Sequence, residues 1–113
     1  MLQYKNKAMI LEINNIPKVS FNVYNHLHWT RKKAFKDNLR LLLMSVTRVQ
    51  LQGSYNLDFK FYFKGRKLDT INVTHIVKII EDYLFKQDNE NRKICMEVFK
   101  STENKCILTI TKN

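Results

Sequence analysis

Apolar and polar side chains alternate without exception over residues 55–64. The polar positions carry Asn, Asp, Lys, Tyr and Lys, and the apolar positions are Tyr55, Leu57, Phe59, Phe61 and Phe63. Successive side chains of a β-strand point to opposite faces of the sheet, so this segment predicts a strand with one face in the core. We therefore assign the aromatic row to the core and not to a cofactor site.

Two further segments have the spacing of amphipathic helices. The first begins after Thr30 as a predicted N-cap, ends at residues 52–54, and has apolar side chains in steps of three and four at Phe35, Leu39, Leu42, Val46 and Val49. The second is predicted from about residue 72 to residue 85, with a buried stripe of Val73, Ile76, Val77, Ile80 and Leu84. Residues 17–29, before the first helix, are predicted to form an extended loop.

The remaining strands complete a mixed α+β pattern. Residues 8–14 alternate and predict a strand, while residues 93–100 and 105–111 predict a hairpin. The expected order is strand, helix, strand, helix, strand, strand. The sequence contains no linker and no internal repeat, so we expect a single α+β domain over residues 1–113, with a mixed sheet packed by two helices.

The charge balance points to a polyanionic partner. Among 113 residues, 20 are Lys or Arg and 10 are Asp or Glu, which gives a net charge of +10. Lysines and arginines that neutralise phosphates release condensed counterions, so such a chain suits nucleic acid, although a basic protein without that role fits the same balance. No apolar run approaches the roughly 20 residues of a membrane span, and no signal peptide is recognised. Cys95 and Cys106 lack metal-ligand spacing, so we expect reduced thiols in the cytoplasm.

Cations gather at two places in the sequence, and we expect both groups to contact DNA phosphates. The first group lies at the start and on the polar side of the first helix: Arg31, Lys32, Lys33, Lys36 and Arg40. The second is the basic turn that contains Arg66 and Lys67. Trp29 precedes the first group, and it either stacks on an exposed base or packs in the core against the first helix.

The polar side of the second helix carries groups that could perform chemistry. On a helical wheel, His75, Lys78 and Asp82 lie within about 60° of one another. Asp69 precedes the helix and Asp88 follows it. Carboxylates can hold Mg²⁺, which activates water, while a lysine stabilises charge on phosphate. A structural role is the alternative for each residue. Asp69 can interact favourably with the N-terminal end of the helix dipole, and Lys78 and Asp82 can form an exposed ion pair. Asp88 can be solvated. The spacing leaves both interpretations open.

Three stretches of the sequence resemble motifs of one family. Residues 16–22 (IPKVSFN) are similar to its opening segment, and residues 28–33 (HWTRKK) to a basic stretch of its divergent branch. Residues 66–72 (RKLDTIN) resemble its basic turn and first acidic motif, and they are followed by Lys78, Asp82 and Asp88-Asn89. The family is that of the RusA-like Holliday junction resolvases of phages and prophages. The resemblance runs from about residue 8 to residue 111.

The resemblance implies a fold, a reaction and a location. It implies a homodimeric, Mg²⁺-dependent endonuclease, with Mn²⁺ as a substitute, that resolves four-way DNA junctions during phage recombination and repair in the bacterial cytoplasm. Asp69 and Asp88 match the metal-binding acids, Lys78 the assisting lysine and Asp82 the helix acid. Branched or duplex DNA is then the partner, and neither a membrane nor an organic cofactor is involved.

Two positions depart from the family pattern. Ile71 and Asn89 stand where resolvases carry acids, and each missing carboxylate lowers the affinity for a metal ion. An alternative is therefore a RusA-like fold that has lost catalysis and binds nucleic acid. A further alternative is a small phage protein that presents its basic surface to an acidic host protein.

Overall fold

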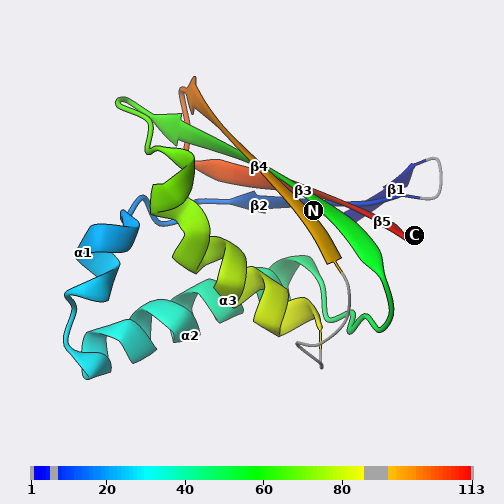
Figure 1. The fold of residues 1–113 in the computed structure, drawn as a ribbon, viewed down its shortest axis with the longest axis horizontal. Coiled ribbons are helices and arrows are strands. Elements are labelled where there is room, and N and C mark those ends of the chain that lie inside the picture. Colours follow the sequence, from blue (N-terminus) through cyan, green and yellow to red (C-terminus); the bar gives the residue numbers. More distant parts are fainter. Residues whose placement is uncertain (1, 6–7, 86–91, 113) are drawn as a thin grey trace.

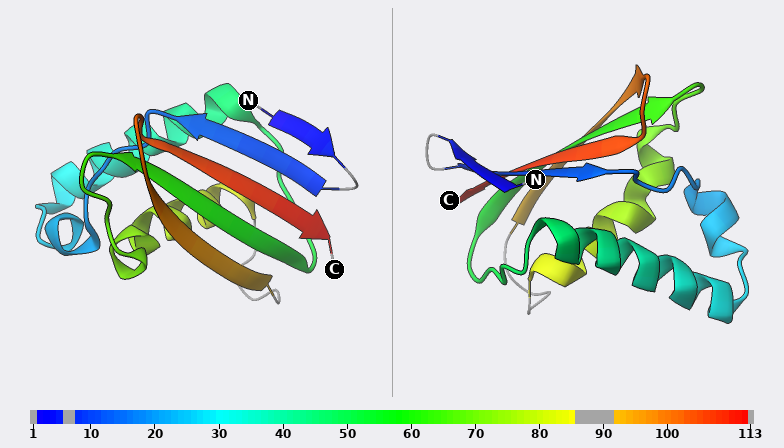
Figure 2. Two further views of the ribbon diagram at one scale, coloured as in Figure 1. Left: turned by 90° about the horizontal axis from the view of Figure 1, so that it is seen from above. Right: turned by 180° about the vertical axis from the view of Figure 1, so that it is seen from behind.

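The helices of this chain cover one face of a five-stranded sheet (Figures 1 and 2). The structure is a computed structural model that describes residues 2–5, 8–85 and 92–112. In chain order the elements are β1 (Leu2–Lys5), β2 (Ala8–Asn14), α1 (Phe21–Asn25), α2 (Trp29–Val46), β3 (Tyr55–Lys64), the 3₁₀ helix η1 (Thr70–Val73), α3 (Thr74–Leu84), β4 (Arg92–Ser101) and β5 (Lys105–Lys112). The prediction of one α+β domain with a mixed sheet is confirmed at this level. No helix among the described residues is long and apolar enough to span a bilayer.

The strands lie side by side in the order β1-β2-β5-β3-β4. β3 pairs parallel to β4 and antiparallel to β5, and β5 also pairs antiparallel to β2. The predicted hairpin between residues 93–100 and 105–111 is therefore wrong, because β3 lies between these two strands. β3 has an apolar inward face, and its place between β5 and β4 satisfies its backbone hydrogen-bonding groups on both sides. The chain crosses from β4 to β5 over the end of β3 (Figure 2).

The segment predicted as an extended loop contains α1. Ser20 caps this short helix, since its hydroxyl accepts a hydrogen bond from the backbone N–H of Val23 at 3.2 Å. The N-cap of α2 is His28, whose Nδ1 accepts from the N–H of Thr30 at 3.3 Å. The prediction of Thr30 as the cap is therefore wrong, and the element order gains α1 as well as β1.

The first predicted helix is shorter than its sequence pattern suggested. α2 ends at Val46, and Thr47 is extended with φ −157° and ψ 150°. Three of the four residues from Val46 to Val49 are β-branched, which favours an extended backbone. Leu51 then forms a parallel bridge with Phe85, just beyond α3. The segment after α2 thereby reaches the sheet end where β3 begins.

The predicted core residues are largely confirmed. Leu57, Phe59, Phe61 and Phe63 of β3 are buried, and so is the predicted stripe of α3. Burying one such side chain contributes about 1.5–3 kcal/mol, so these two patterns account for much of the drive to fold. The stripe of α2 contributes buried Leu39, while Phe35, Leu42 and Val46 are half-buried. Cys106 is buried in the core and Cys95 is exposed, and both are free thiols as predicted.

Candidate nucleic-acid interface

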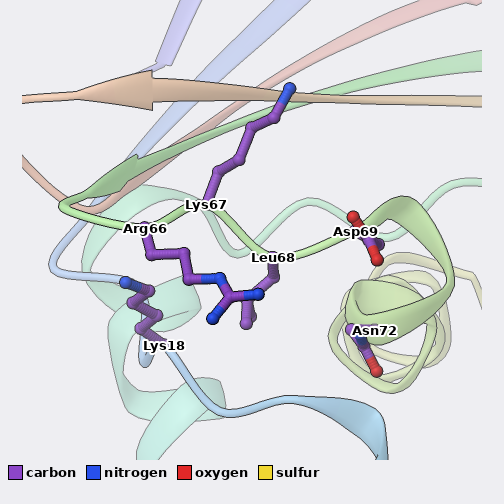
Figure 3. A pocket seen from close by; sticks show the side chains of 6 residues that line it. All are labelled: Lys18, Arg66, Lys67, Leu68, Asp69 and Asn72. Atoms are coloured by element: carbon purple, nitrogen blue, oxygen red, sulfur yellow. The ribbon is translucent and has the colours of Figure 1, made fainter.

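A cavity of about 360 Å³ lies beside the turn that follows β3 (Figure 3). Its lining residues are Lys18, Arg66, Lys67, Leu68, Asp69 and Asn72. Gly65 adopts φ +74° in this turn, a conformation that glycine tolerates better than other residues. The Nζ of Lys18 donates a hydrogen bond to the backbone carbonyl of Lys64 at 3.0 Å, which holds this lysine against the turn. Three cations from two distant segments therefore meet around one cavity, which we call the turn cavity.

The cations of the turn cavity do not all point the same way. In Figure 3 the side chains of Lys18 and Arg66 lie close together and Lys67 points away from them. Lys67 also lines a neighbouring cavity with Asp69, Thr70 and Val98. Arg66 and Lys67 are exposed, as a phosphate contact requires. Sequence reasoning did not identify Lys18, because its place beside Arg66 depends on the tertiary fold.

A second basic surface follows the outer side of α2, and we call it the α2 face. It surrounds a shallow cavity of about 360 Å³ lined by Trp29, Lys32, Lys33, Lys36, Asp37 and Arg40. Asp37 pairs with Lys33 at 3.0 Å and lies 3.9 Å from Arg40, so one acid serves two cations. Trp29 is 69% exposed, which rules out the core position considered above, and its ring centroid lies 5.7 Å from that of His28 in a tilted arrangement. Arg31 is exposed outside this cavity.

A third cavity, open to solvent and of about 320 Å³, is lined by residues of α1, α2 and α3. We call it the aromatic cavity, and its lining residues are Phe21, Tyr24, Lys36, Thr74, His75, Lys78, Ile79 and Asp82. As predicted, His75, Lys78 and Asp82 share one side of the second helix. The prediction that His75 lies on a polar surface is wrong, because His75 is only 5% exposed.

His75 is enclosed by aromatic rings. Its ring centroid lies 4.8 Å from that of Tyr24 in a stacked arrangement, 5.6 Å from Phe35 and 6.0 Å from Phe21. Burial lowers the pKa of His75 to about 4, because the charged ring loses its hydration, while the backbone of Val19 acts in the opposite direction. Within the described part of the chain, neither ring nitrogen has a partner in hydrogen-bonding geometry. The imidazole is therefore neutral at physiological pH.

The predicted acidic residues do not gather in one place. Asp82 pairs with Lys78 at 2.9 Å as an exposed i,i+4 pair on α3. Asp69 is exposed at the N-cap of η1, and it lines the turn cavity and not the aromatic cavity. Asp88 lies outside the described residues. Across residues 2–5, 8–85 and 92–112, no group of three or more His, Cys, Asp or Glu side chains could hold a metal ion. Mg²⁺ is commonly held by one or two carboxylates together with water, and Asp88 is not among the described residues, so the metal site stays a prediction.

Comparisons with known proteins identified no relative of this chain. A scan against protein-family models, a search of curated proteins and a search of solved structures each found no match for this chain. The resemblance to RusA-like resolvases therefore stays a prediction based on the short motifs given above.

Proposed function

We propose that the protein binds nucleic acid along a strip made of the turn cavity, the aromatic cavity and the α2 face. The observation that carries this proposal is that the aromatic cavity has apolar walls and neighbours two basic surfaces. Lys36 lines both the aromatic cavity and the α2 face. Asn72 of the turn cavity lies in η1, and η1 contacts α1, which supplies Phe21 and Tyr24 to the aromatic cavity. The three parts are therefore neighbours on the helical layer.

The charge along this strip supports the proposal. Eight cations and only three acids line the three cavities. The cations are Lys18, Lys32, Lys33, Lys36, Arg40, Arg66, Lys67 and Lys78, and the acids are Asp37, Asp69 and Asp82. A phosphate backbone that follows the strip meets a net positive surface, and the counterions it releases favour binding. Aromatic and apolar side chains between cations are also typical of surfaces that bind nucleic acid.

The second candidate function is the Mg²⁺-dependent endonuclease of a homodimer that cuts four-way junctions. The exposed position of Asp69 among the cations of the turn cavity favours it, since a scissile phosphate held by Lys18 and Arg66 would lie near a carboxylate. Among the described residues, Asp69 belongs to no group of three or more His, Cys, Asp or Glu side chains that could hold a metal ion. We therefore assign no step of the reaction to a metal.

One gel separates the two candidates. A labelled four-way junction and a matched linear duplex are each incubated with the protein in Mg²⁺, Mn²⁺ or EDTA. Nucleic-acid binding alone gives a shifted but uncut band in every lane. Paired nicks that disappear in EDTA, and that the Asp69→Asn variant does not produce, support the endonuclease. If neither DNA is shifted at low salt, or if added salt leaves the shift unchanged, the binding proposal is wrong.

A further inference from the structure

Two exposed aromatic rings lie on the helical layer. Phe21 is 40% exposed and Trp29 is 69% exposed. Each is the first residue of its helix, Phe21 in α1 and Trp29 in α2. Phe21 lines the aromatic cavity and Trp29 lines the cavity of the α2 face. Each cavity therefore offers one aromatic surface that solvent, or a ligand, can reach.

A lysine lies at both cavities. Lys36 lines the aromatic cavity and the α2 face, and no carboxylate of the described residues forms an ion pair with it. The neighbouring cations differ in this respect, because Lys33 pairs with Asp37 and Lys78 pairs with Asp82. Lys32 of the α2 face likewise has no ion pair with a described carboxylate, but of these two lysines only Lys36 lines both cavities.

The ring of Phe21 lies next to other aromatic rings. Its ring centroid lies 6.0 Å from that of His75, which in turn stacks on Tyr24 at 4.8 Å. His75 is neutral and Tyr24 is buried, so the floor of the cavity is uncharged. A flat apolar surface with a cation beside it matches a nucleotide, whose base has apolar faces and whose phosphate is an anion.

We propose that Phe21 and Trp29 are stacking platforms for two unpaired bases of a nucleic-acid strand, and that Lys36 binds a phosphate between them. This inference rests on the proposed function and specifies its substrate as single-stranded nucleic acid, or the unpaired part of a branched one. Base–aromatic stacking contributes about 1–3 kcal/mol per base. The bases of an intact duplex stack on each other and leave no face for either ring, so the platforms select unpaired bases.

Trp29 supplies a direct readout, since it is the only tryptophan in the sequence. The protein is titrated with an oligothymidine strand and, separately, with a duplex of equal length, and tryptophan fluorescence is recorded. Stacking quenches the indole emission, so the single strand should quench it strongly. The duplex should bind with at least about 30-fold lower affinity and little quenching, as expected from the loss of two stacked bases at about 1 kcal/mol or more each.

Two substitutions test the assigned residues. Phe21→Leu keeps an apolar cover over His75 but removes the aromatic face, so it should weaken single-strand binding by about 5- to 100-fold and leave duplex binding unchanged. Lys36→Gln should lower the affinity for the strand and reduce the slope of log K against log salt by about one. The matched control is Tyr4→Leu, an aromatic residue 69% exposed on β1, which should bind as wild type does.

Each outcome decides between the inferences. The assignment of Phe21 and Trp29 as stacking platforms is wrong if Phe21→Leu binds the strand as wild type does. It is also wrong if duplex and strand bind equally without quenching. The proposed function stands in both cases. Absence of binding to either DNA overturns both. Because Phe21 also packs in α1, circular dichroism checks that its variant folds. Trp29→Leu, followed by the anisotropy of a labelled strand, gives a second measurement that does not depend on α1, and wild-type affinity there also overturns the proposal.

Discussion

The side chain of Asn104 accepts a hydrogen bond from the backbone N–H of Lys64, with 2.7 Å between Oδ1 and the nitrogen. The backbone carbonyl of Asn104 accepts a second hydrogen bond, from the N–H of Ile16 at 3.3 Å. One residue of the β4–β5 connection thereby contacts the end of β3 and the segment after β2. This residue fixes the path on which the chain crosses β3.

Asn104→Ala should lower the free energy of unfolding by about 1 kcal/mol, because the N–H of Lys64 loses its partner. Thr102→Ala, an exposed substitution in the same connection, should change it by no more than about 0.5 kcal/mol. Urea denaturation followed by circular dichroism measures both variants. Equal stability of Asn104→Ala and wild type would contradict the role assigned to this side chain.

Two neighbouring acids on α3 should differ in their contribution to stability. Glu81 accepts a hydrogen bond from Nε of Arg92 at 2.9 Å, and the two side chains are only 12% and 4% exposed. The guanidinium of Arg92 also lies 4.2 Å from the ring centroid of Phe85. Glu81→Gln should therefore cost about 2 kcal/mol, because it weakens a charged hydrogen bond with little access to water.

The control for this pair is Asp82→Asn. It removes the exposed Lys78–Asp82 pair and should cost at most about 0.5 kcal/mol. Guanidinium chloride would screen both ion pairs, so urea is the denaturant for the comparison. The assignment fails if the two variants lose the same stability.

His75 should make the fold sensitive to acid. Its pKa is about 4 in the folded protein and 6.5 in the unfolded chain, so the unfolded state binds the proton first as the pH falls. The contribution of neutral His75 to the free energy of unfolding is therefore complete above pH 6.5. It falls by about 1.4 kcal/mol per pH unit as the pH is lowered toward 4. Urea midpoints at pH 7, 6 and 5 measure this loss. His75→Leu should show a flatter profile over the same range, and an unchanged slope would exclude His75 as its cause.

The salt dependence of nucleic-acid binding should identify the cations that contact phosphate. Arg66→Gln should weaken binding to all DNA sequences alike and reduce the slope of log K against log salt by about one. Lys93→Gln provides the matched control, because Lys93 is exposed on β4 at the sheet face that the helices leave open. Equal effects of the two variants would mean that overall charge, and not the strip, determines binding.

The sequence predicts which faces are buried better than it predicts which strands are neighbours. The alternation in β3 and the stripe of α3 follow directly from the periods of strand and helix, and both are confirmed. An alternating pattern states which side of a strand faces the core, but it contains no information about the adjacent strand. The hairpin was therefore predicted from closeness in sequence, and the insertion of β3 between β4 and β5 was missed. α1 is five residues long, too short for its period to be recognised.

In the candidate interface too, some features follow from the sequence and others depend on the tertiary fold. Arg66 and Lys67 are adjacent in the sequence, so their common place in one basic turn could be predicted. Lys18 joins them only because the segment before α1 folds against the turn after β3. For Trp29 the sequence left core and surface open, and the choice depends on where α2 begins. The rings of α1 help to bury His75. Because α1 was predicted as an extended loop, His75 was predicted on the polar side of its helix.

The place of β5 has a consequence for synthesis on the ribosome. β5 is the strand that joins the β1–β2 pair to the β3–β4 pair, and it follows all of them in the chain. While a nascent chain lacks residues 105–112, β2 and β3 each keep one edge without a partner. Such edges invite pairing with other chains. Completion of this sheet therefore has to await the emergence of β5, and a cell that makes the protein must shield two open edges until then.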